Sequence, residues 1–171
     1  MIRLDLISIH RDAESLFDMM CSADQYLFSV PISCHTTEGF TCWLQDRLAF
    51  DFHDFRGIYN DDKLIGFVHN YDFSYRDGRC HVAACIKEEY RGSGAGVKAS
   101  VSFLRYLFHT YPLRKIYTSV YSYNTQSLLT NQRAGFVEEG RLLESRYHQG
   151  KYWDTVIFSV TKEQFYEEFG N

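Results

Sequence analysis

The chain has 171 residues, 45% of them hydrophobic, and carries a formal net charge of −4 at pH 7. This length and composition exclude a disordered chain and predict one domain over residues 1–171 with a buried core. The acidic balance and the lack of a basic block argue against nucleic acid as a partner.

The number and spacing of the cysteines and the length of the apolar segments indicate the cellular compartment. The five cysteines show no Cys-x-x-Cys spacing, so we expect free thiols in a reducing cytoplasm. The first residues lack the apolar stretch of a signal peptide, and no apolar run is long enough to cross a membrane. We therefore expect a cytoplasmic protein with no membrane partner.

The first half of the chain alternates between strand and helix patterns. Ile2, Leu4 and Leu6 alternate with polar residues, which predicts a strand with one buried face. Asp12 is the expected N-cap of a helix whose apolar stripe ends at Met20. The pattern then predicts, in order, a short helix and a loop over residues 21–37, a helix over 38–49, and a hairpin of strands over 50–59 and 64–73.

The second half contains one strand–loop–helix–strand crossover and a last hairpin. Its predicted elements are a strand over residues 80–86, a helix over 97–110, a strand over 115–123, a short helix over 124–134 and strands over 136–147 and 152–161. Gly135 is expected in a left-handed cap, and the charged tail over 162–171 as a helical turn or a frayed end. Together these elements predict an α+β fold with a mixed, mostly antiparallel sheet and about four helices.

The crossover contains the loop sequence Tyr-Arg-Gly-Ser-Gly-Ala-Gly, which ends where the helix over 97–110 begins. The first turn of a helix has N–H groups without internal partners, and glycines let these groups approach a bulky anion. Gly92, Gly94 and Gly96 can turn their N–H groups inward, and Arg91 adds a permanent charge, so the loop predicts a pyrophosphate site. The loop is not a P-loop and fits the dinucleotide fingerprint only loosely, so a flexible turn is the alternative interpretation.

The order of these elements resembles the GNAT superfamily of acetyl-coenzyme A-dependent N-acetyltransferases. The positions that match its motifs are Arg91, Gly94 and Gly96 in the loop, Asn124 and Ser127 downstream, the segment 134–140, and Gly150, Tyr152 and Asp154 near the end. The last of these motifs is similar to the branch that includes ribosomal-protein N-terminal acetyltransferases and spermidine acetyltransferases. The resemblance implies about seven strands, with the fourth and fifth, residues 81–86 and 115–123, splayed apart.

The resemblance implies acetyl-coenzyme A as the cosubstrate, with its pyrophosphate on the loop amides of Arg91, Gly92, Ser93, Gly94, Ala95 and Gly96. The pantetheine arm would lie in the gap between the splayed strands and pair with the backbone of Ala84, Cys85 and Ile86. Asn124 would donate or accept a hydrogen bond near the thioester, and Ser127 would support the same arm. The alternatives are a turn residue or helix cap for Asn124 and an ordinary helix residue for Ser127.

The reaction that the resemblance implies is acetyl transfer to a primary amine by direct attack in a ternary complex. A lysine-like amine, with a pKa of about 10.4, is almost wholly protonated at pH 7, so a base must accept a proton. Many family members place a Glu on the fourth strand for this purpose, and His81 occupies that position here. Its ordinary pKa of about 6.5 suits a general base, and a purely structural strand histidine is the alternative. We interpret the other six histidines as surface or loop residues, and none of them has metal-ligand spacing.

One departure from the family concerns the leaving thiolate. Asn131 occupies the position where many members have a Tyr that acts as a general acid. Tyr121 and Tyr123 are near in sequence, but nothing in the sequence favours one of them. Because Asn131 and His81 stand in place of a Tyr and a Glu, a coenzyme A-binding module that has lost catalysis is the second hypothesis.

The acceptor amine stays open between a peptide, a polyamine and a small metabolite. We expect residues 21–50 and 146–153 to shape its pocket. The acidic residues Asp51, Asp54, Asp61 and Asp62 can attract a polyamine or form a solvated hairpin face. A homodimer is common in the branch that the chain resembles, which makes a second copy a candidate partner.

Overall fold

The computed structural model describes residues 1–21, 34–49 and 51–170. Within them, seven strands form one sheet in the order β1-β2-β3-β4-β5-β7-β6. The strands are β1 (Ile2–Leu6), β2 (Phe55–Asn60), β3 (Lys63–Ser74), β4 (Arg79–Ile86), β5 (Lys115–Tyr121), β6 (Val137–His148) and β7 (Lys151–Thr161). The helices are α1 (Ile9–Met20), α2 (Thr37–Leu48), α3 (Ala95–Thr110), α4 (Thr125–Arg133), α5 (Lys162–Phe169) and the short 3₁₀ helix η2 (Glu88–Tyr90).

This architecture confirms the predicted α+β fold with a mixed, mostly antiparallel sheet, since only β4 and β5 pair in parallel. The described residues form five α-helices where the sequence predicts about four. The additional helix is α5, which begins at a capping box in which the side chains of Thr161 and Gln164 each accept a hydrogen bond from the other's backbone N–H. Phe165 anchors it because this ring is fully buried.

The predicted start of the first helix is wrong by one turn. The helix begins at Ile9 with Ser8 as the N-cap residue, and Asp12 lies in its first turn. Asp12 is buried, and its carboxylate accepts hydrogen bonds from the Ser8 N–H at 2.8 Å and from the Tyr59 hydroxyl at 2.7 Å. A carboxylate near a helix N-terminus is favourable at either position, which is why the sequence alone misplaces the boundary. The predicted short helix and loop over 21–37 lie for the most part outside the described residues.

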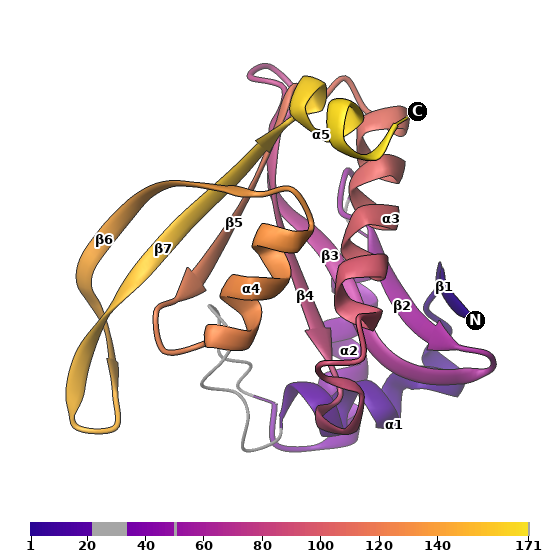
Figure 1. Cartoon of the computed structure of the whole chain (residues 1–171). Coiled ribbons are helices and arrows are strands. Elements are labelled where there is room, and N and C mark those ends of the chain that lie inside the picture. Colours follow the sequence, from indigo (N-terminus) through magenta and orange to yellow (C-terminus); the bar gives the residue numbers. More distant parts are fainter. Residues whose placement is uncertain (22–33, 50, 171) are drawn as a thin grey trace.

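Two hydrophobic cores lie on opposite faces of the sheet. On one face α3 packs against a core that contains Val68 and Val82, and on the other α1 and α2 cover Phe55 and Phe67 (Figure 1). Phe67 and Val68 are neighbours in β3 and point to opposite sides, as successive residues of a strand must. Both faces of the sheet are therefore buried near its centre.

The sheet opens between β4 and β5. Their parallel pairing is limited to Arg79, Cys80 and His81 on β4 and ends there. Beyond His81 the two strands diverge, and the edge of β4 over residues 82–86 has no partner strand on that side (Figure 1). This divergence is the splay that the resemblance implies.

Two further findings concern membrane-spanning helices and the cysteines. No helix in the described part of the chain is both long and apolar enough to cross a membrane. All five cysteines are free thiols, and only Cys80 is fully buried.

Candidate active site

A cavity of about 730 Å³ lies at the opening between β4 and β5. Its wall includes Val68 and Val82, which belong to the core under α3, and Phe55 and Phe67, which belong to the core under α1 and α2. Residues from both faces of the sheet line one space, so the cavity passes through the sheet. We call the part on the α3 and α4 side the coenzyme half and the part on the α1 and α2 side the acceptor half.

The glycine loop closes the coenzyme half at the N-terminus of α3. Gly92 and Gly94 have φ angles of 78° and 82°, and Gly94 is the N-cap residue of the helix. A Cβ at either position would meet no atom within 4 Å, so the backbone conformation and not lack of space calls for glycine. The left-handed conformation turns consecutive N–H groups toward one side of the loop, as in an anion-binding nest.

Several loop amides are available to a ligand. The N–H groups of Gly92, Gly94, Gly96 and Val97 have no hydrogen-bond acceptor among the described residues. All four of these residues line the cavity. A loop that presents free N–H groups at the positive end of a 16-residue helix is suited to a phosphate group.

Two of the predicted loop residues play a different part. Ser93 does not line the cavity, because its hydroxyl donates to the Tyr90 carbonyl at 2.7 Å and accepts from the Ala95 N–H at 3.3 Å. Ala95 is buried beneath the loop. These contacts hold the loop in shape, while Arg91 and the glycines face the cavity.

The end of β4 and Arg91 meet at the rim of the cavity. Ala84, Cys85 and Ile86 all line it, as predicted for the strand that faces the pantetheine arm. The Arg91 side chain also lines it, and its Nε donates to the Ile86 carbonyl at 3.0 Å. One lone pair of that carbonyl is therefore in use, whereas β5 does not pair with this part of β4.

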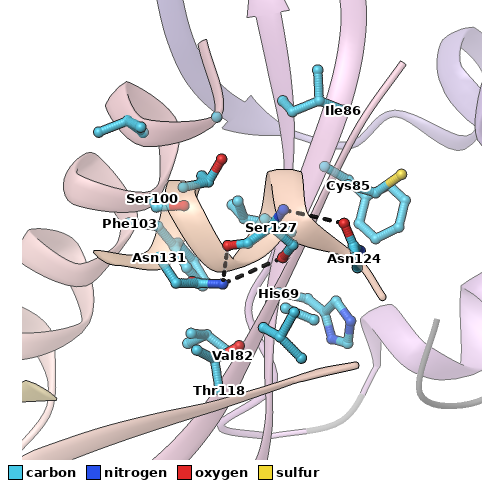
Figure 2. A pocket seen from close by; sticks show the side chains of 18 of the residues that line it. His69, Val82, Cys85, Ile86, Ser100, Phe103, Thr118, Asn124, Ser127 and Asn131 are labelled. Carbon is cyan, nitrogen blue, oxygen red and sulfur yellow. Dashed lines mark hydrogen bonds between the residues drawn. The ribbon is translucent and has the colours of Figure 1, made fainter. Parts of the chain in front are cut away.

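Asn124 lies across the cavity from β4, at the N-terminus of α4 (Figure 2). Its Oδ1 accepts a hydrogen bond from the Ser127 N–H at 3.1 Å, so it is the helix cap that the sequence offered as an alternative. Its Nδ2 has no acceptor among the described residues, and the side chain lines the cavity. One amide thus caps the helix with its oxygen and presents a donor with its nitrogen.

Ser127 and Asn131 form a small network one turn further along α4 (Figure 2). The Asn131 Nδ2 donates to the Ser127 carbonyl at 2.9 Å and lies 3.3 Å from the Ser127 Oγ. Both side chains line the cavity. Because the Asn131 amide is bonded to its own helix and has no acidic proton, it cannot replace the tyrosine that many family members have at this position.

His81 lies just outside the cavity, at the last pair between β4 and β5. Its ring stacks between those of Tyr71 and Tyr117, with centroid distances of 5.3 Å to each. Its Nδ1 lies 3.2 Å from the Asp72 carboxylate, but the direction is not that of a hydrogen bond. Burial lowers the pKa of His81 below its ordinary value, against the opposing effect of Asp72. Among the described residues, Tyr71 and not His81 lines the cavity at this point.

A second histidine, His69 on β3, does line the cavity (Figure 2). The interpretation of His69 as a surface or loop residue is therefore wrong. It pairs with Ala83 on β4, two residues beyond the point where β4 leaves β5. Burial, with a smaller effect of the nearby His53, lowers the pKa of His69 to about 3, so this imidazole is neutral at physiological pH.

The hydrogen bonds of His53 and His69 fix the position of their protons. His53 Nδ1 lies 2.9 Å from the Arg47 carbonyl, which can only accept, so this nitrogen carries the proton. His69 Nδ1 lies 3.4 Å from the Asn70 carbonyl, which can only accept, and 3.3 Å from His53 Nε2, so the proton of the neutral His69 ring is on Nδ1 and can be donated to His53 Nε2. His69 Nε2 is left with a free lone pair and has no partner among the described residues.

The four acidic residues considered for polyamine attraction do not line the cavity. Asp54 accepts hydrogen bonds from Arg56, Tyr106 and Tyr111 at 2.9, 2.9 and 2.6 Å. Asp61 pairs with the N-terminal amine and Asp62 with Arg3, while Asp51 is exposed. Within the described part of the chain, no Asp or Glu contributes to the cavity wall.

Comparison with known proteins agrees with this geometry. The family profile described as "Acetyltransferase (GNAT) domain" matches residues 3–137. The chain is 28% identical over 123 residues to the SPbeta prophage-derived uncharacterized N-acetyltransferase YokL of Bacillus subtilis (strain 168), covering 72% of this chain and 70% of the relative. It is 24% identical over 109 residues to the putative ribosomal N-acetyltransferase YdaF of the same organism, covering 64% of this chain and 60% of the relative.

Among solved structures, the spermidine N-acetyltransferase of Vibrio cholerae in complex with CoA and spermine superposes with a TM-score of 0.86. The superposition covers 96% of this chain and 97% of the other at 20% sequence identity. At this identity the likeness shows the fold. The predicted likeness to ribosomal and spermidine acetyltransferases is confirmed by these relatives.

Proposed function

Because the chain belongs to the GNAT family of acetyltransferases, we propose that it transfers an acetyl group from acetyl-coenzyme A to a primary amine by direct attack in a ternary complex. The observation that carries this proposal is the cavity that passes through the sheet, with free loop amides in one half and a neutral imidazole on its wall. Acetyl-coenzyme A supplies the activated thioester, and residues 1–171 act as one cytoplasmic acetyltransferase domain.

The residues of the coenzyme half fit the groups of this cosubstrate. The free N–H groups of Gly92, Gly94 and Gly96, together with Arg91, are suited to the pyrophosphate, and each hydrogen bond to a charged group contributes about 1.5–3 kcal/mol. Ser93 and Ala95 hold the loop in shape. The predicted backbone partners of the pantetheine amides are Ala84, Cys85 and Ile86, and the predicted side-chain partners are Asn124 and Ser127.

His69 is the proton acceptor that the geometry favours. Its Nε2 lone pair takes a proton from the attacking amine, and its Nδ1–H passes a proton to His53 Nε2. Its lowered pKa keeps this imidazole neutral, so the Nε2 lone pair is available, but it also makes the ring a weak base, so the proton must pass on to His53 Nε2 as the amine attacks. His81, the base predicted from the sequence, stays a candidate, although Tyr71, on which its ring stacks, lines the cavity in its place.

The departing thiolate also requires a proton. Asn131 has none to give, so Tyr123 becomes the candidate, because it lines the cavity beside Asn124. The second hypothesis, a coenzyme A-binding module without catalysis, rests on Asn131 and His81, which stand in place of the family's Tyr and Glu.

Release of free thiol from acetyl-coenzyme A across a panel of amines tests the proposal. Release that depends on an added amine supports acetyl transfer. Equal release without any amine contradicts it, because that result is hydrolysis. Binding of coenzyme A without release in the presence of any amine favours the binding module.

The predicted homodimer remains a proposal as well. Four large apolar side chains of the hairpin β6–β7 are exposed, namely Leu142, Leu143, Tyr147 and Tyr152. A contiguous exposed apolar patch is typical of a protein interaction surface. Sedimentation of the full chain measures whether two copies associate.

A further inference from the structure

The charges on the cavity wall are of one sign. Within the described residues, the charged side chains that line it are Arg47, Arg91 and Arg133, and no carboxylate is among them. Arg91 belongs to the glycine loop and Arg133 to α4, so both accompany the coenzyme half, where phosphate groups are expected. Arg47 comes from α2 and is the charged residue of the acceptor half.

Arg47 has a defined position and no counter-ion among the described residues. Its guanidinium lies 5.3 Å from the ring centroid of Trp43, which also lines the cavity. No carboxylate of the described residues pairs with it, and the side chain is partly buried. Its backbone carbonyl holds His53, and its positive charge contributes to the lowered pKa of His69, which places Arg47 electrostatically close to the proton relay.

An unpaired guanidinium in a partly enclosed cavity selects its ligand by charge. It attracts a carboxylate or phosphate, which it can bind through two parallel hydrogen bonds. It repels a polycation, because each ammonium group would enter a space to which the described residues contribute positive charge and no carboxylate. The acidic residues that could have compensated, such as Asp54 and Asp61, already have partners elsewhere.

We propose that the acceptor of this acetyltransferase is an amine that also carries an anionic group, and that Arg47 binds that group. The body of the acceptor packs on the apolar wall of Trp43, Phe55 and Phe67, and its amine faces His69. The inference rests on the proposed acetyl transfer, since it names the acceptor of that reaction. It separates this chain from the Vibrio cholerae relative of the same fold, whose structure contains spermine.

Matched pairs of amines test the inference. L-Phenylalanine is compared with L-phenylalaninamide, and phosphoethanolamine with ethanolamine, with spermidine as the polycation. We expect a kcat/KM for the anionic member of at least one pair that is about 10–100-fold higher than for its neutral partner, as for a charge-assisted hydrogen bond. The less basic amine of the amide would favour the opposite order, so basicity alone does not produce this result.

The variant Arg47→Gln should remove the difference within each pair, whereas the matched control Arg76→Gln should keep it. Arg76 is exposed and does not line the cavity. Preference for spermidine or for the neutral members, unchanged in Arg47→Gln, overturns the inference and leaves acetyl transfer intact.

Absence of thiol release with every amine instead contradicts the proposed function itself. Calorimetric titration of the same pairs into the protein loaded with coenzyme A then tests Arg47 independently. Equal binding of both members of each pair overturns the inference, and tighter binding of the anionic member that is lost in Arg47→Gln supports it.

Discussion

The two halves of the cavity are built in different ways. The coenzyme half consists mainly of main-chain groups from one short segment, residues 91–97, and the adjoining ends of β4 and α4. The acceptor half consists of side chains from α1, α2, the segment before β2, and β3, which are separated by tens of residues. A site made of backbone is tied to a local motif, whereas a site made of dispersed side chains can change its specificity while the fold stays the same.

The largest effect is expected from Gly94→Val, which acts on the coenzyme half. The residue has a φ of 82°, so a β-branched side chain distorts the loop and misdirects its amides. Loss of two hydrogen bonds to a charged group predicts coenzyme A binding about 1,000-fold weaker by calorimetry. Gly150→Val is the matched control, with the same φ of 82° and open space around its Cβ, but outside the glycine loop and not part of the cavity wall. Equal losses of binding in both variants would show that strain and not the amides matters.

The next effect tests the proton relay of the acceptor half. His69→Ala should lower kcat about 100-fold at pH 7, the contribution of a positioned general base. The loss should shrink as the pH rises, because the amine then loses its proton to solvent without help. Coenzyme A affinity should stay unchanged. His81→Ala is the competing variant, and a larger, pH-dependent loss there would return the role of base to His81.

The two roles of Asn124, as helix cap and as donor to coenzyme A, can be tested by different substitutions. Asp is as good an N-cap as Asn, so Asn124→Asp should keep the thermal stability of the protein. It replaces the free Nδ2 donor by an acceptor, and we expect coenzyme A binding about 10-fold weaker. Asn124→Ala should lose both stability and affinity. Unchanged affinity in Asn124→Asp would mean that the residue serves only the helix.

The last effect is on stability and not on activity, and it concerns the attachment of α1, which supports the acceptor half. Burial alone would raise the pKa of Asp12, but hydrogen bonds from Arg11, the Ser8 N–H and the Tyr59 hydroxyl lower it overall. A lowered pKa in the folded state stabilises the protein above the ordinary pKa of about 4 and ceases to do so as the pH falls through the folded value. Asp12→Asn should lower the free energy of unfolding by about 2 kcal/mol at pH 7, and denaturant titrations should show this difference disappear below about pH 4.

The contrast between the halves also explains what the sequence could predict. Arg91, Gly94 and Gly96 form a contiguous pattern before a helix, so the coenzyme half follows from the order of residues along the chain. The role of His69 cannot be predicted in this way. Its partner His53 is distant in sequence, and only the pairing of β2 with β3 brings the two rings together. The alternation of Phe67, His69 and Tyr71 does place these side chains on one face of a strand, but it does not reveal that the face borders a gap.

The limited pairing of β4 with β5 has a consequence for the dynamics of the protein. Residues 82–86 carry main-chain groups on the side toward β5 that no strand protects. In the absence of a ligand, amides on that side exchange their hydrogens with water far sooner than those in the complete ladder between β3 and β4. A molecule that lies in the gap and pairs with this edge supplies the missing hydrogen bonds, so we expect its binding to slow the exchange of these amides.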